Sequence, residues 1–255
     1  MTVETNEEKE ALREGGKRLA VVLEALGKAA LPGVTASELD VYAKRLIEEG
    51  GDTPAFLKYR PHGAPRPYPA TLCVSINDVI VHGIPNEHEI ILREGDIVAL
   101  DCGLIHKGLI TDAAITVSVG TADAKGVRLI AATKEALLQG IAAARAGNTT
   151  GDIGYAVEQY VKPLRYGIPK ELGGHGVGRM VHEDPDVPNY GKRGSGEVLT
   201  AGMVIAIEPM LTEGSAKIMV DDDGYTIRTT DGGRSAHFEH TVLITEGDPE
   251  ILTHV

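Results

Sequence analysis

The first fifty residues of the chain have the hydrophobic pattern of two helices. Between residues 6 and 30, apolar residues recur every three or four positions, on a face made of Leu12, Leu19, Val22, Leu23 and Leu26. This spacing predicts an amphipathic helix that Asn6 caps and that ends before Pro32-Gly33. A second helix is expected to begin at the capping box Thr35 to Glu38 and to end at Gly50-Gly51.

The middle of the chain changes to strand patterning. A strand is expected at residues 71–76, and the β-rich runs Ile97–Cys102 and Leu109–Val119 predict a hairpin with its turn at His106-Lys107-Gly108. Two more helices are expected at 122–147, capped by Thr121, and at 150–163, capped by Thr150. Residues 203–208 predict an apolar strand, and residues 224–245 a second hairpin that turns at Asp231-Gly232-Gly233.

Helices grouped before and after runs of strands favour one fold class. The order predicts an α+β fold, with an antiparallel sheet covered by helices, in a single domain over residues 1–255. Residues 52–70 predict an irregular segment, because five prolines interrupt them. Its aromatic residues Phe56, Tyr59 and Tyr68 indicate a wall of a site rather than a linker.

The first hairpin carries two aspartates in otherwise apolar strands. With His106 and Lys107 at the tip, Asp101 would lie directly opposite Asp112. Directly opposed like charges destabilise a sheet, and a buried carboxylate pair needs a cation, a shared proton or a basic partner. A metal ion satisfies both carboxylates, whereas a solvated hairpin edge with scattered acids is the alternative.

Two further acids and a histidine enlarge the pattern. Glu208 and Glu239 also interrupt apolar strands, and His175 lies among four glycines in the segment 172–178. Four carboxylates and one imidazole suit two divalent ions such as Mn, Fe, Co or Zn, whose charge the four acids balance. His82 and His182 lie in loops beside these strands and are candidates for catalysis.

Composition narrows the classes of partner. The 255 residues carry a net charge of −12, which argues against a broad nucleic-acid-binding surface such as DNA requires. No apolar run approaches the ~20 residues of a membrane span, and the acidic N-terminus does not resemble a signal peptide. The two cysteines, Cys73 and Cys102, lie in apolar runs and indicate reduced thiols in a cytoplasmic protein.

Five ordered motifs identify a resemblance that covers about residue 10 to Thr253. They are SIND-VIVHGIP, GDIVALDCG with Asp112 eleven residues beyond Asp101, GGHGVGRMVHEDP, GMVIAIEPM and SAHFEHT. Together they closely resemble the type I methionine aminopeptidases, members of the M24 metallopeptidases. The resemblance implies the pita-bread fold, in which two pseudo-symmetric halves surround a dinuclear metal centre.

The resemblance also implies roles for individual residues. Asp112 and Glu239 would bridge two metal ions, Asp101 would bind one of them, and His175 with Glu208 the other. Glu208 would accept a proton from a bridging water, His82 would contact the substrate amine and leaving nitrogen, and His182 the scissile carbonyl. The methionine pocket would be lined by Phe56, Tyr59, Cys73, Val181 and Tyr225, and a monovalent cation (Na or K) would lie near Asn77, Val79 and Ser235.

The implied activity is removal of the initiator methionine from nascent chains whose second residue is small. Two divalent ions (Co, Mn, Fe, Zn or Ni) would serve as cofactors, the ribosome would be a partner, and the enzyme is expected to be a monomer. The chain departs from the family pattern at His237, where glutamine is expected, and in the longer loop 60–69.

Two other functions stay open. A prolidase or Xaa-Pro aminopeptidase shares the fold, but those relatives carry an additional N-terminal domain, and only 81 residues precede His82. A non-catalytic peptide-binding relative is the other alternative, although such proteins lose ligands, and all five ligand positions and both histidines are present here. Hydrolysis of Met-Ala-Ser beside an Xaa-Pro peptide separates the three functions.

Overall fold

A nine-stranded antiparallel sheet organises the molecule. The structure, a computed structural model, describes residues 1–254. The main path of the sheet runs β1 (Thr53–Pro54), β4 (Ile97–His106), β5 (Leu109–Ser118), β13 (Glu239–Leu243), β8 (Val204–Ile207), β6 (Gly173–Gly176) and β7 (Glu183–Pro188). Two strands join it from the side, β2 (Leu72–Ile76) on β4 and β14 (Glu250–Ile251) on β13.

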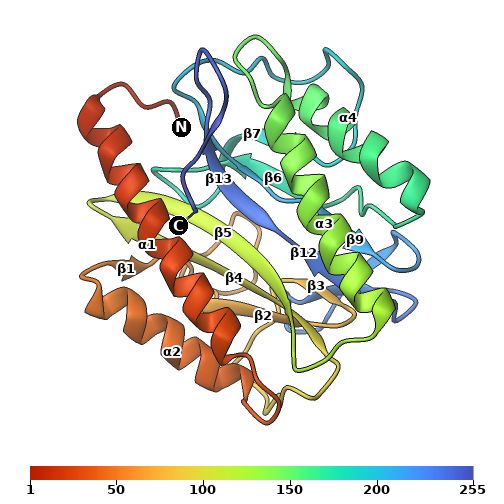
Figure 1. The fold of residues 1–255 in the computed structure, drawn as a ribbon. Coiled ribbons are helices and arrows are strands. Elements are labelled where there is room, and N and C mark those ends of the chain that lie inside the picture. The colour runs from red at the N-terminus through yellow and green to blue at the C-terminus, as the bar shows by residue number, and fades with distance from the viewer. Residues whose placement is uncertain (255) are drawn as a thin grey trace.

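Smaller strand groups flank this sheet. β10 (Ile218–Val220), β11 (Ile227–Thr229) and β3 (Val79–Val81) form a three-stranded sheet, and β9 (Met210–Thr212) pairs with β12 (Ser235–His237). Two pairs of helices cover the large sheet, α1 (Asn6–Ala29) with α2 (Ala36–Glu49), and α3 (Ala124–Ala143) with α4 (Thr150–Val161), while the 3₁₀ turn η1 (Lys162–Leu164) follows α4 (Figure 1). The predicted α+β class, with helices over an antiparallel sheet, is confirmed.

The two helix pairs bury separate apolar clusters against the sheet. Leucines of α1 and α2 pack with Val98, Leu100 and Cys102 of β4 and with Ala113 of β5. The cluster beneath α3 and α4 brings strands β7, β8 and β13 together with Ile141 and Ile153. Because neighbouring residues of a strand face opposite sides, side chains next to these buried positions point away from the helices.

The helices begin within a few residues of the predicted positions, but their caps differ. Thr5, not Asn6, caps α1, and its side chain accepts a hydrogen bond from the backbone of Glu8. Asp123 caps α3 instead of Thr121, and Thr149 caps α4 instead of Thr150. The capping box at Thr35 is confirmed. In each of these three helices, two residues with a side-chain oxygen lie within two positions of each other. Residue type alone therefore could not identify which of the two caps the helix.

The register of the first hairpin is shifted from the prediction. Asp101 pairs with Ala114 and Asp112 with Gly103, so the two aspartates are diagonal neighbours rather than directly opposed. The cause is the turn, because Lys107 and Gly108 both adopt positive φ (49° and 82°) and form the two-residue tip. A shift of two positions in the pairing preserves the side of the sheet, so both carboxylates still share one face.

The second predicted hairpin is wrong. β12 pairs with β9, and β11 pairs with β10 and β3, so the segments on either side of Asp231-Gly232-Gly233 do not pair with each other. The turn residues are present, but both strands find partners elsewhere in the chain. A hairpin does form nearby, between β10 and β11.

Close packing of α1 against the C-terminal segment gives a test of the fold. A Cβ atom at Gly16 would lie 2.3 Å from the backbone oxygen of Leu252, which cannot move without disturbing β14. We expect Gly16→Ala to lower the free energy of unfolding by about 1–3 kcal/mol, although alanine is the better helix former. Denaturant unfolding measures the change.

Gly27 of the same helix is the matched control. A Cβ atom there would first meet the side-chain end of Ile115, at 3.1 Å, which can shift. Gly27→Ala should therefore cost much less than Gly16→Ala. Equal stability of the two variants would contradict the tight approach of α1 to Leu252.

Candidate metal centre and active site

One cavity collects the predicted catalytic residues. It has a volume of about 290 Å³, and it is lined by every residue that the sequence assigned to catalysis, metal ligation or the methionine pocket: Phe56, Tyr59, Cys73, His82, Asp101, Asp112, His175, Val181, His182, Glu208, Tyr225 and Glu239. These residues come from segments throughout the chain. The fold therefore brings together a set that the sequence could only group by chemistry.

Strand alternation aims the acids into this cavity. Cys102 and Ala113 are buried in the cluster beneath α1 and α2. Their neighbours Asp101 and Asp112 consequently face the other side of the sheet, which is the side of the cavity.

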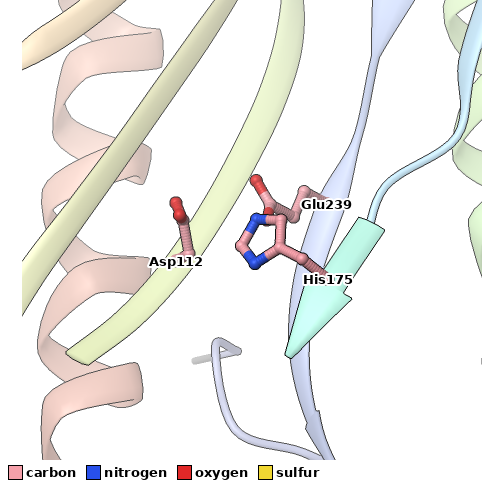
Figure 2. A group of neighbouring side chains, drawn as sticks. All are labelled: Asp112, His175 and Glu239. Atoms are coloured by element: carbon pink, nitrogen blue, oxygen red, sulfur yellow. The ribbon is translucent and has the colours of Figure 1, made fainter. Parts of the chain in front are cut away.

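Three of the side chains converge closely. Asp112 on β5, His175 on β6 and Glu239 on β13 point toward one another, and their ligand atoms all lie within 4.8 Å of each other (Figure 2). Nδ1 of His175 lies 2.9 Å from the backbone oxygen of Gly176. If Nδ1 carries the proton and donates it there, Nε2 keeps a free lone pair for a metal ion.

The other two predicted ligands lie against this group. Oε1 of Glu208 is 3.4 Å from Nε2 of His175. Asp101 lies diagonally across the hairpin from Asp112, and burial, followed by the charge of Asp112, raises its pKa.

Burial makes the acid cluster electrostatically costly without a cation. Desolvation, followed by the charges of neighbouring acids, raises the pKa of Asp101, Asp112 and Glu239 well above the usual range. Burial raises the pKa of Glu208 to about 8. Such shifts mark groups whose ionised form lacks water and lacks compensating charge.

Unused lone pairs show that the residues fit divalent ions. Among residues 1–254, Oδ1 of Asp101, Oδ1 of Asp112 and Oε1 of Glu239 are buried and have no hydrogen-bond partner. Buried polar atoms are rarely left unpaired in proteins, and carboxylate oxygens with imidazole nitrogen suit divalent metals.

Hydroxyl and amide groups hold the backbone at these positions. Thr241 Oγ1 donates to the backbone oxygen of Asp112 and accepts from its backbone nitrogen, at 2.7 and 2.9 Å. Asn189 Nδ2 donates to the backbone oxygen of Glu208 at 3.0 Å. These contacts fix the strands that carry the acids, and none of them was predicted from the sequence.

Three histidines, His82, His175 and His182, line the same cavity as the acids. The rings of His175 and His182 meet edge to face, with centroids 4.4 Å apart, and the hydroxyl of Tyr59 lies 3.1 Å from Nδ1 of His182. Burial, and then the charge of His182, lowers the pKa of His82 to about 4. His82 is therefore neutral near pH 7.

His237 lies closer to the centre than the sequence indicated. Its side chain is fully buried, and its Nε2 is 3.4 Å from Oε2 of Glu208. Burial lowers its pKa to about 3, so it stands beside Glu208 as a neutral imidazole. Thr116 Oγ1 fixes its backbone by bonds to both the nitrogen and the oxygen.

The cavity wall also contains residues that the sequence analysis did not include in the methionine pocket. Tyr68 lies edge to face with Tyr225, with ring centroids 5.2 Å apart, and donates to the backbone oxygen of Gly83. Pro61, His62 and Ala64 add a further part of the wall. The aromatic residues of the proline-rich segment were the available signal, since they suggested a wall before its position was known.

The predicted residues of the monovalent-cation site also come together. Ser235 Oγ donates to the backbone oxygens of Asn77 and Val79, at 3.0 and 2.8 Å. Asn77 and Val79 line a separate hollow of about 440 Å³ whose acids include Asp78 and Asp221, both paired with Arg228. This larger hollow contains none of the predicted catalytic residues.

Comparisons with known proteins agree with this geometry. The pattern of metallopeptidase family M24 matches residues 10–246. Methionine aminopeptidase 1 of Mycobacterium tuberculosis is 46% identical over 252 residues, which are 96% of this chain and 92% of that protein. Methionine aminopeptidase of Clostridium acetobutylicum is 41% identical over 251 residues, 98% of both chains.

Solved structures place the fold in the same group. The crystal structure of methionine aminopeptidase from Thermotoga maritima superposes with a TM-score of 0.93 and 40% identity, and all of both chains is covered. Prolidase from Pyrococcus furiosus has a TM-score of 0.76 at 23% identity, and this chain covers 66% of it, which is a likeness of fold alone. The chain belongs to metallopeptidase family M24 and, within that family, to the methionine aminopeptidases.

Proposed function

We propose that the protein removes the N-terminal methionine from nascent chains whose second residue is small. The observation that carries this proposal is the buried group of Asp112, His175 and Glu239, beneath a cavity walled by aromatic and apolar side chains. The free amine of an N-terminal methionine would suit the buried acids, and its thioether side chain would suit the aromatic and apolar wall. Xaa-Pro cleavage is disfavoured, because the likeness to prolidase is one of fold only.

Five side chains would hold two divalent ions. Asp112 and Glu239 would bind both ions, Asp101 would bind one of them, and His175 with Glu208 would bind the other. The orphaned buried oxygens of Asp101, Asp112 and Glu239 support this assignment. When bound, such ions activate water and polarise the scissile carbonyl. Co, Mn, Fe, Zn and Ni all agree with this donor set.

Glu208 would accept and release protons, and His82 and His182 would contact the reacting groups of the substrate. A carboxyl group with a pKa of about 8 can take a proton from water and return it near neutral pH. If the Tyr59 hydroxyl donates to Nδ1 of His182, then Nε2 of His182 carries a proton and can donate to the carbonyl oxygen. Neutral His82 would contact the substrate amine and the leaving nitrogen.

The remaining assignments follow from the same activity. Phe56, Tyr59, Cys73, Val181 and Tyr225 are proposed to line the methionine pocket. The carbonyls of Asn77 and Val79, with Ser235, are proposed to hold a monovalent cation. We also propose that residues 1–255 form one catalytic domain that works as a monomer in the cytoplasm, close to ribosomes. No helix within residues 1–254 is long and apolar enough to cross a membrane.

Substrate choice tests the function directly. We expect metal-loaded enzyme to release methionine from Met-Ala-Ser, to act much more slowly on Met-Leu-Ser, and not to cleave Ala-Pro. The expectation follows from family membership. Chromatography of the products measures all three reactions, and preferential cleavage of Ala-Pro would favour the prolidase alternative.

Substitution of the proposed bridging ligands tests the metal centre. Asp112→Asn and Glu239→Gln each remove a charged ligand, so metal content measured by elemental analysis should fall and activity should drop by several orders of magnitude. His182→Ala is the matched control. It should keep the metal but lose kcat, by about 2.7–4 kcal/mol in barrier height. Normal metal stoichiometry in Asp112→Asn would refute the assignment.

The pH dependence of stability provides an independent test. Because the folded acids have raised pKa values, about 8 for Glu208 against an ordinary 4.5, the metal-free folded state binds more protons than the unfolded state across this window. Its stability should therefore fall as the pH rises from about 4.5 toward 8. Metal binding needs ionised acids and neutral His175, so it strengthens over the same range.

The gap between the melting temperatures with and without metal should thus widen from pH 5 to pH 8. Melting curves recorded with metal and with a chelator measure it at each pH. A gap that stays constant, or is larger at pH 5, would mean that the four acids do not form one buried cluster.

A further inference from the structure

The loop at residues 60–67 leaves the cavity wall and returns to it. Residues 60–67 run out between Tyr59 and Tyr68, which both line the cavity. Two backbone hydrogen bonds close the base of this loop, from Lys58 to the oxygen of Tyr68 at 2.9 Å and from Tyr68 to the oxygen of Tyr59 at 2.8 Å. The loop is therefore an extension of the wall itself.

Contacts with distant segments hold the loop in place. The guanidinium of Arg66 forms a two-point ion pair with Glu87 and donates to the backbone oxygen of Asp223. The hydroxyl of Tyr225 donates to the backbone oxygen of Arg66. Pro65 packs so closely over Gly224 that a Cβ atom there would lie 2.6 Å from the proline ring. The loop is fastened to the turn between β10 and β11.

The fastened loop forms one side of the cavity mouth. Pro61, His62 and Ala64 line the cavity on the loop side, and Val220 of β10 lines it from another element. Val220 is apolar and 56% exposed, so it presents apolar surface in the cavity lining.

We propose that residues 60–67 are a specificity wall for the peptide beyond its second residue. This inference rests on the proposed function, because it places the free amine of the substrate at the buried acids. The rest of the chain must then leave through the mouth, where its third residue passes between Ala64 and Val220. The wall is apolar at Ala64, so an apolar third residue is favoured.

A pair of charge substitutions at Ala64 tests this placement. Ala64→Asp and Ala64→Lys are assayed on the amidated peptides Met-Ala-Lys-Gly and Met-Ala-Asp-Gly. If the third residue passes Ala64, Ala64→Asp should raise the kcat/KM ratio of the lysine to the aspartate peptide about two- to five-fold, and Ala64→Lys should lower it equally. An unchanged ratio in both variants overturns the proposal.

The controls separate this inference from the proposed function. Val41 is 67% exposed on α2, and Val41→Asp with Val41→Lys adds the same charges away from the mouth, so the ratio should not change. All the variants should still cleave Met-Ala-Ser. If the parent enzyme cleaves Met-Ala-Ser but the two Ala64 variants do not change the kcat/KM ratio in opposite directions, the proposed specificity wall is wrong and the proposed function is not affected.

Release of the loop gives a second measurement. Arg66→Ala removes the ion pair with Glu87, and we expect the KM of Met-Ala-Phe-Gly amide to rise about three-fold with little change in kcat, since a looser wall binds the third residue less well. Met-Ala-Gly-Gly amide should be nearly unaffected, and Arg66→Lys should restore part of the loss. Equal effects on both peptides would indicate a general structural role and contradict the wall.

Discussion

The structure depends on keeping four carboxylates together at buried positions along one cavity. Like charges repel, and burial penalises each ionised group, so the arrangement requires compensation by cations or by bound protons. The fold also holds the acids in position through contacts to the backbone segments that carry them. The helix cluster on one face holds β4 and β5, and Thr241 of β13 and Asn189, just after β7, donate hydrogen bonds to the backbone oxygens of Asp112 and Glu208. The acids cannot separate to relieve their repulsion without breaking these contacts.

Features that depend on residues close together in the sequence, such as strand alternation and helix positions, were predicted well. Alternation along β4 and β5 put Asp101 and Asp112 on one face, and this remained true when the register moved by two residues, because the side-chain period of a strand is two. The turn geometry itself depends on positive φ at Lys107, which residue type does not dictate. Helix positions were close, but caps were missed where several oxygen-bearing residues competed.

Features that depend on distant pairing were not predictable in the same way. The segment 224–245 has the turn residues of a hairpin, yet β12 pairs with β9 and β11 pairs with β3, more than a hundred residues away. Strand propensity states that a segment will pair, but not with which partner. Tyr68 was predicted to belong to a wall, but its contact with Tyr225, which is distant in the sequence, was not predicted. The candidate site residues were grouped by the family resemblance. That resemblance reflects contacts between distant segments, which local sequence patterns do not predict.

Within the cluster, Glu208 differs from the other acids in its surroundings. Asp101, Asp112 and Glu239 each keep a buried oxygen without a partner inside residues 1–254, which leaves lone pairs for ligation. Each oxygen of Glu208 instead lies 3.4 Å from an imidazole nitrogen, one of His175 and the other of His237. Both imidazoles are neutral near pH 7, so neither supplies the full charge that would hold Glu208 permanently ionised. Its pKa of about 8 follows from burial in these neutral surroundings. These surroundings are consistent with the two proposed roles of Glu208, as a metal ligand beside His175 and as a group that gains and loses a proton.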